Sequence, residues 1–85
     1  MHEYVTLPDD TTFAFSDLLA DGSIEVLVER PTMDGFDSAR YSLPSLTMES
    51  SEGFSDLDLG RISSFVARNA PIITSLAGER ERQYA

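Results

Sequence analysis

The residues best suited to chemistry in this chain are carboxylates, and they are concentrated near its beginning. Residues 1–29 contain seven acidic side chains and neither Lys nor Arg. Neighbouring carboxylates can transfer protons, but general acid–base catalysis requires a pocket that holds the substrate against them. A chain of 85 residues forms one small core and rarely encloses such a pocket. The acidic segment is therefore more typical of a binding surface than of an active site.

The other residue types argue against an enzyme, a metal and a cofactor. His2 is the single histidine and lies at the chain end, where nothing would orient it for catalysis. Cysteine is absent, and the five glycines are scattered singly rather than grouped in a phosphate-binding loop. Residues Asp56–Gly60 resemble the start of a calcium loop, but Ser64 and Phe65 stand where further oxygen ligands are required. We therefore expect no catalytic residues, no metal and no cofactor.

The overall charge excludes some partners and favours others. The chain has a formal net charge of -9, with six arginines and no lysine. Nucleic acids and anionic membranes are bound through Lys and Arg, so neither is an expected direct partner. A basic protein is the expected partner. The lack of cysteine, and of an apolar stretch of about 20 residues that could span a membrane, favours the cytoplasm.

Alternation of apolar and polar residues predicts a sheet over the first part of the chain. The expected strands span residues 3–7, 11–15, 24–30 and 36–43, with a short fifth strand at 46–49. Residues 16–20 are predicted to form a single helical turn. Arg40 is expected to face Glu25 or Glu29 across a hairpin, which would help to fix the register of the two strands.

The C-terminal part of the chain predicts helix. Ser55 suits the N-cap, and apolar residues then recur at helical spacing. Pro71 is expected either to kink this helix or to begin a second one capped by Asn69, with Gly78 as its end. Strands followed by helix indicate an α+β fold, in which a helical segment packs on one face of an antiparallel sheet of four to five strands. We expect a single domain over residues 1–78 and a frayed charged tail over 79–85.

The exposed acids supply the main candidate site. The sequence predicts that turns and one sheet face present them to a basic partner, together with one exposed leucine. The candidate partner-binding residues are Asp9, Asp10, Asp17, Asp21, Glu25, Leu27, Glu29, Asp34 and Asp37. The leading hypothesis is an inhibitor or regulator, monomeric or homodimeric, that mimics DNA and occupies the nucleic-acid-binding surface of a basic protein.

An alternative reading gives the acids no role beyond solubility. The protein would then be a structural or antitoxin-like module that binds through an apolar face. Tyr4 and Thr6 are expected on the face opposite Val5, where they could form an apolar patch with Leu27. In that case, changing Leu27 would matter more than removing charge.

Several segments carry a resemblance to known proteins. Thr6–Asp9, Gly35–Arg40, Gly53–Ser55 and Asn69-Ala70 are similar to small uncharacterised acidic bacterial proteins, a likeness that implies no activity. The small, acidic and cysteine-free composition also resembles that of anti-CRISPR proteins and other phage-encoded inhibitors. That second likeness implies a protein that acts by binding another protein.

Overall fold

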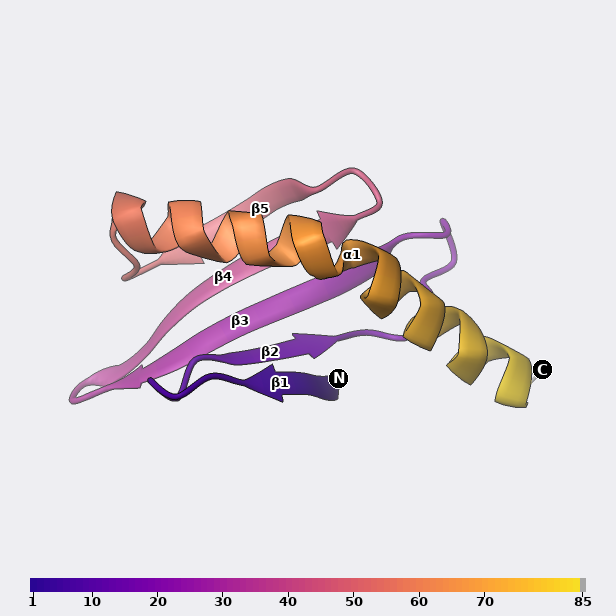
Figure 1. The fold of residues 1–85 in the computed structure, drawn as a ribbon, viewed down its shortest axis with the longest axis horizontal. Coiled ribbons are helices and arrows are strands. Elements are labelled where there is room, and N and C mark those ends of the chain that lie inside the picture. Colours follow the sequence, from indigo (N-terminus) through magenta and orange to yellow (C-terminus); the bar gives the residue numbers. More distant parts are fainter. Residues whose placement is uncertain (85) are drawn as a thin grey trace.

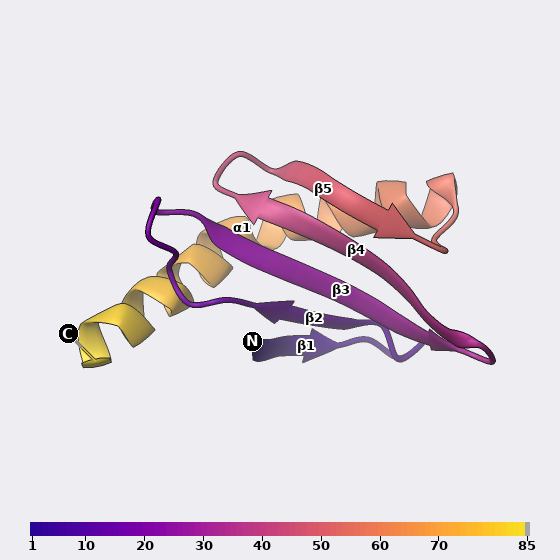
Figure 2. The ribbon, with the colours of Figure 1, turned by 180° about the vertical axis from the view of Figure 1, so that it is seen from behind.

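The chain folds as a five-stranded antiparallel sheet with one long helix across one face. The structure is a computed structural model that describes residues 1–84, with side chains through residue 83. The strands are β1 (His2–Thr6), β2 (Thr12–Phe15), β3 (Ile24–Thr32), β4 (Gly35–Leu43) and β5 (Thr47–Glu52), in the spatial order β1-β2-β3-β4-β5. Helix α1 (Asp56–Tyr84) crosses one face of the sheet (Figure 1), and no other described element covers the opposite face (Figure 2). The expected α+β fold is confirmed.

The core lies between the sheet and α1 and follows the predicted alternation. Every second residue of β2, of residues 24–28 in β3 and of residues 39–43 in β4 is buried, and the residues between them face away from the helix. The buried apolar side chains are Phe13, Phe15, Ile24, Val26, Val28, Ala39, Tyr41, Leu43, Phe54, Ile62, Val66, Ile73 and Ala77. Each large apolar side chain contributes about 1.5–3 kcal/mol when fully buried, so this contact is the main source of stability.

Strand β1 departs from the expected alternation. Its register with β2 shifts between Glu3 and Val5, which places an extra residue in the strand. Tyr4 is that residue, and its hydroxyl donates a 2.7 Å hydrogen bond to Oδ1 of Asn69 on α1. The prediction that Tyr4 lies on the face opposite Val5 is therefore wrong, and the expected apolar patch of Tyr4, Thr6 and Leu27 does not form.

The connection between β2 and β3 contains no helical turn over residues 16–20, contrary to the prediction. Ser16 instead extends the pairing with β3, because its backbone N–H donates to the carbonyl of Glu25 and its hydroxyl accepts from the N–H of Glu25. A turn follows in which the N–H of Gly22 bonds the carbonyl of Leu19. Pairing with β3 satisfies the hydrogen-bonding groups of the backbone here, as a short helix would also have done.

Helix α1 is one continuous helix, so the two-helix alternative and the predicted end at Gly78 are both wrong. The N-cap is as expected, since the hydroxyl of Ser55 accepts from the N–H of Asp58 at 3.1 Å. Pro71 lies inside the helix and is exposed, and α1 bends near its middle (Figure 1). A proline removes one backbone hydrogen bond and kinks a helix without ending it when the helix is held on both sides by packing. The buried residues Val66 and Ile73 lie on either side of this position.

The last turns of α1 fall in the segment expected to be a frayed tail. Residues 79–84 continue the helix, and Ala85 lies outside the described residues. Glu, Arg and Gln predominate there, and all three have good helix propensity, which outweighs the cost of about 1 kcal/mol for a glycine inside a helix. Whether this end frays in solution remains a prediction.

Candidate functional site

The nine candidate residues do not form one continuous surface. They lie at both ends of the sheet and on both of its faces. Asp9 and Asp10 occupy the β1–β2 turn, Asp17 and Asp21 the β2–β3 connection, Glu25, Leu27 and Glu29 the uncovered face of β3, Asp34 the β3–β4 turn, and Asp37 the helix side of β4. The single acidic side that the sequence suggested is therefore divided into separate groups.

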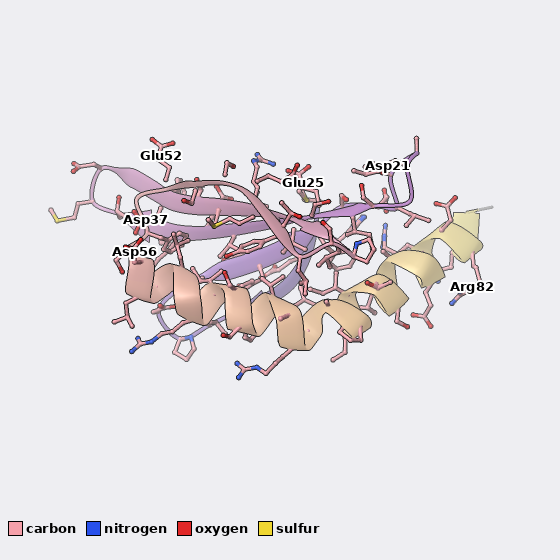
Figure 3. The ribbon with its side chains drawn as sticks, turned by 90° about the horizontal axis from the view of Figure 1, so that it is seen from above. Asp21, Glu25, Asp37, Glu52, Asp56 and Arg82 are labelled. Carbon is pink, nitrogen blue, oxygen red and sulfur yellow. The ribbon has the colours of Figure 1, made fainter. Side chains whose placement is uncertain are left out.

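One group is on the uncovered face of the sheet, which we call the open face. Cross-strand register places Glu3, Leu27 and Arg40 in one row, and Glu29 and Glu52 in another. Leu27 is half-buried there. Figure 3 shows Glu25 and Glu52 projecting from the side of the sheet away from α1.

Charge on the open face is strongly one-sided. This face carries four carboxylates, those of Glu3, Glu25, Glu29 and Glu52. In the rows formed by these residues there is one guanidinium, that of Arg40. Arg40 forms an ion pair with Glu25, which is one of the two pairings expected from the sequence. Glu29 and Glu52 make no ion pair with any residue in 1–84. They lie two strands apart, a separation of about 10 Å between backbones.

A second group of acids is held by Arg30 on the helix side of the sheet. The guanidinium of Arg30 lies 2.9 Å from a carboxylate oxygen of Asp37, 3.0 Å from Asp58 and 3.9 Å from Asp9. Its central carbon is 4.9 Å from the ring centroid of the buried Phe54. One cation thus joins the β1–β2 turn, β4 and the first turn of α1, so these acids hold the fold together.

The pKa values of these carboxyls follow from their hydrogen bonds. The pKa of Asp58 is lowered below its ordinary value, first by the hydrogen bond from Arg30 and then by Ser55 at the N-cap. The pKa of Asp9 is lowered chiefly by its hydrogen bonds with Thr11, whose backbone N–H donates at 3.0 Å, with a smaller contribution from Arg30. Both groups are therefore held in the charged form.

Two further candidates are engaged in local contacts in the β2–β3 connection. Asp17 accepts a 2.8 Å hydrogen bond from the His2 ring and lies 3.3 Å from Nε of Arg80, which links this connection to the end of α1. Its pKa is lowered, mostly by His2. Asp21 closes a turn by accepting from the N–H and hydroxyl of Ser23, which lower its pKa. The carboxylates of both residues therefore have hydrogen-bond partners within the protein, and their positions are explained without a ligand.

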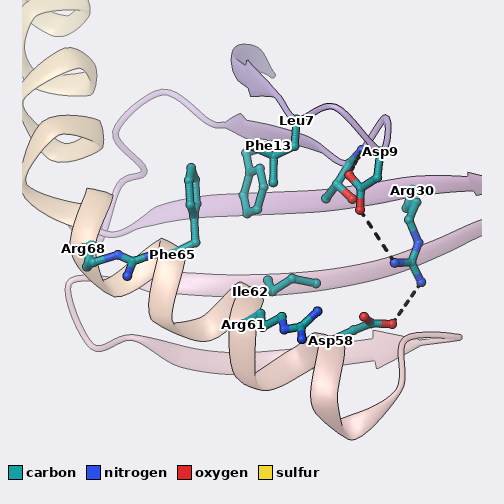
Figure 4. A pocket seen from close by; sticks show the side chains of 10 residues that line it. Leu7, Asp9, Phe13, Arg30, Asp58, Arg61, Ile62, Phe65 and Arg68 are labelled. Atoms are coloured by element: carbon teal, nitrogen blue, oxygen red, sulfur yellow. Dashed lines mark hydrogen bonds and ion pairs between the residues drawn. The ribbon is translucent and has the colours of Figure 1, made fainter.

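Sequence reasoning missed a groove between the β1–β2 hairpin and the first half of α1. Its volume is about 350 Å³, and Figure 4 shows it from close by. The lining residues are Leu7, Asp9, Thr11, Phe13, Arg30, Asp58, Arg61, Ile62, Phe65 and Arg68. The helical spacing of Arg61, Phe65 and Arg68 was a signal for this site, because residues four and seven apart share a helix face.

Sequence reasoning also missed an apolar tip on the longest hairpin. Met33 is fully exposed in the turn between β3 and β4, and 63% of Phe36 is exposed beside it. Apolar side chains at the end of a projecting hairpin are candidates for contact with another protein.

Within residues 1–84, no cluster of three or more His, Asp or Glu side chains is arranged to hold a metal ion. Over the same residues, α1 is not apolar enough to cross a membrane. Comparison with known protein families, with curated proteins and with solved structures finds no significant match. The function must therefore be inferred from the residues of this chain.

Proposed function

We propose that this protein is a small acidic binding module that docks a basic surface of another protein on its open face. The observation that carries the proposal is the excess of carboxylate on that face, with Glu29 and Glu52 making no ion pair within residues 1–84. Charges of one sign on an uncovered, rigid sheet increase the association rate with a partner of opposite charge.

The open face refines the set of residues proposed to bind the partner. Glu25, Leu27 and Glu29 remain in it, and Glu3 and Glu52 join them. Asp9 and Asp37 leave it, because their carboxylates are bound to Arg30. Asp17 leaves it too, since it bonds His2 and Arg80. The remaining candidates, Asp10, Asp21 and Asp34, lie in turns around the sheet and extend the negative field.

The finer hypothesis is that the basic partner is a nucleic-acid-binding protein which this module inhibits. A surface that binds phosphates is rich in Lys and Arg, and a rigid array of carboxylates competes for the same cations. On this hypothesis duplex DNA and the module exclude one another from the partner.

Capture from a cell lysate tests the proposal when two matched variants are compared. The Glu29→Gln/Glu52→Gln variant removes two charges from the open face, and Glu79→Gln/Glu81→Gln removes two from the end of α1. We expect capture by the first variant to weaken by about 1.4- to fivefold per charge, because each exposed pair is worth about 0.2–1 kcal/mol. Capture by the second variant should stay near that of the unaltered protein. Equal effects of the two variants, or capture that is insensitive to salt, would reject the open face.

A second candidate function rests on the hairpin tip. The alternative of a structural or antitoxin-like module that binds through apolar residues is favoured by the exposure of Met33 and Phe36. Here Met33→Ser/Phe36→Ser should abolish capture while Glu29→Gln/Glu52→Gln leaves it intact. The opposite pattern supports the acidic face, and the two functions are thus separated by one experiment.

A further inference from the structure

The groove between the β1–β2 hairpin and α1 has an apolar floor. Phe13 and Phe65 lie with their ring centroids 4.4 Å apart, and Ile62 and Leu7 line the same space (Figure 4). At one end the Arg30 ion pairs with Asp9 and Asp58 connect the hairpin to the helix and close the groove. A volume of about 350 Å³ is within the range of small-molecule sites.

Two guanidinium groups border this floor along α1. Arg61 and Arg68 lie four residues before and three residues after Phe65, so all three share one helix face. Neither arginine makes a hydrogen bond or an ion pair with any residue in 1–84, whereas Arg30 in the same groove is occupied by three carboxylates. In a chain with fifteen acidic residues, two arginines beside an apolar surface are thus left available.

We infer that this groove binds a small amphipathic anion. The apolar body of such a molecule lies on Leu7 and Phe65, the partly buried apolar side chains above the buried Phe13 and Ile62. Its carboxylate or sulfonate accepts hydrogen bonds from Arg61 or Arg68, which lie on either side of Phe65. Guanidinium groups are suited to planar anions because they offer several donors in a fixed geometry. Charge complementarity argues for this occupant over a neutral one, since an uncharged ligand would leave both arginines unused. The inference is independent of the partner proposed for the open face.

The negative charge of the whole protein does not oppose this binding strongly. At an ionic strength of about 0.15 M charges separated by more than about 8 Å are largely screened from one another. The two carboxylates that line the groove, those of Asp9 and Asp58, are already paired with Arg30. The potential felt by a ligand over Phe65 is therefore set by Arg61 and Arg68.

Two fluorescent dyes that differ in charge test the inference. The probe is 8-anilinonaphthalene-1-sulfonate, and the matched neutral probe is N-phenyl-1-naphthylamine, which has the same aromatic body. We expect Arg61→Gln and Arg68→Gln each to weaken binding of the sulfonate by about two- to fivefold, the double variant to weaken it further, and none of them to change binding of the neutral dye. Arg82→Gln, which removes a charge from the last turn of α1, serves as the control and should change neither.

Chemical-shift mapping by NMR locates the bound sulfonate. Shifts centred on Thr11, Ile62 and Phe65 support the inference. Shifts centred on the exposed Leu18 and Leu19 would overturn it. An equal loss of affinity for both dyes in the arginine variants would also overturn it. Unchanged sulfonate affinity in the Arg61→Gln/Arg68→Gln variant would overturn it as well. An acidic peptide tests the competing possibility of a protein ligand. Displacement of the sulfonate by this peptide that requires both arginines and causes no shift at Phe13 or Phe65 would indicate a protein ligand and reject the small anion.

Discussion

Replacing Arg30 by methionine should destabilise the protein more than any other single arginine change among the described residues. The substitution removes the guanidinium but keeps an unbranched apolar side chain beside Phe54. It leaves Asp37, which is only 16% exposed, without its cation, and also frees Asp58 and Asp9. Exposed ion pairs are worth about 0–1 kcal/mol, and loss of one partner from a buried pair costs about 3–5 kcal/mol. The side chain of Arg30 is 27% exposed, so we expect an intermediate loss of roughly 1.5–3 kcal/mol.

Urea unfolding followed by circular dichroism measures this loss. In a domain of this size 1 kcal/mol corresponds to about 4–8 °C in Tm, so the melting temperature should fall by roughly 6–24 °C. Arg68→Met is the matched control, because Arg68 is exposed on α1 and bonds no residue in 1–84; it should stay within about 0.5 kcal/mol of the unaltered protein. If Arg30→Met is no less stable than Arg68→Met, the three ion pairs do not hold the fold together and the reasoning fails.

Two further predictions concern acid and the bulge in β1. Because Arg30 and the N-cap lower the pKa of Asp58 below its ordinary value of 3.8, its contribution to stability is present above that value and is lost as the pH falls through the folded pKa. The urea midpoint should therefore drop between pH 5 and pH 2, and by less in Arg30→Met; an equal drop in both proteins would contradict this. Tyr4→Phe should cost about 0.5–1.5 kcal/mol by removing the hydrogen bond to Asn69, and thermal unfolding that matches the unaltered protein would show that this bond is not formed in solution.

The strands were predictable because their side chains alternate between two environments. Residues 24–30 carry apolar groups on one face and Glu25 and Glu29 on the other, a pattern that only a half-buried strand satisfies. The bulge at Tyr4 was not predictable, because it depends on a hydrogen bond to Asn69, a partner 65 residues away. An inserted residue reverses the alternation, and nothing local marks the place where it occurs.

The continuity of α1 could not be predicted from the sequence for a similar reason. The sequence shows the free-energy cost of placing Pro71 inside a helix. It does not show the packing of Val66 and Ile73 on the sheet, which offsets that cost and depends on the tertiary structure. The distribution of charge was the hardest feature to predict. The candidate acids are close in sequence, but β-turns and strand faces direct them to different sides, and Arg30 comes from a strand that follows Asp9 and precedes Asp37.

The same distribution makes the two proposed surfaces independent, and this can be tested. The open face and the groove lie on opposite sides of the sheet, and packed layers are separated by roughly 10 Å, more than the screening length of about 8 Å at physiological ionic strength. Removing charge from one surface should therefore leave binding at the other unchanged. We expect Glu29→Gln/Glu52→Gln to bind 8-anilinonaphthalene-1-sulfonate as the unaltered protein does at 0.15 M salt. A gain in its affinity at this salt concentration would show that net charge, and not the local arrangement of Arg61 and Arg68, controls the groove.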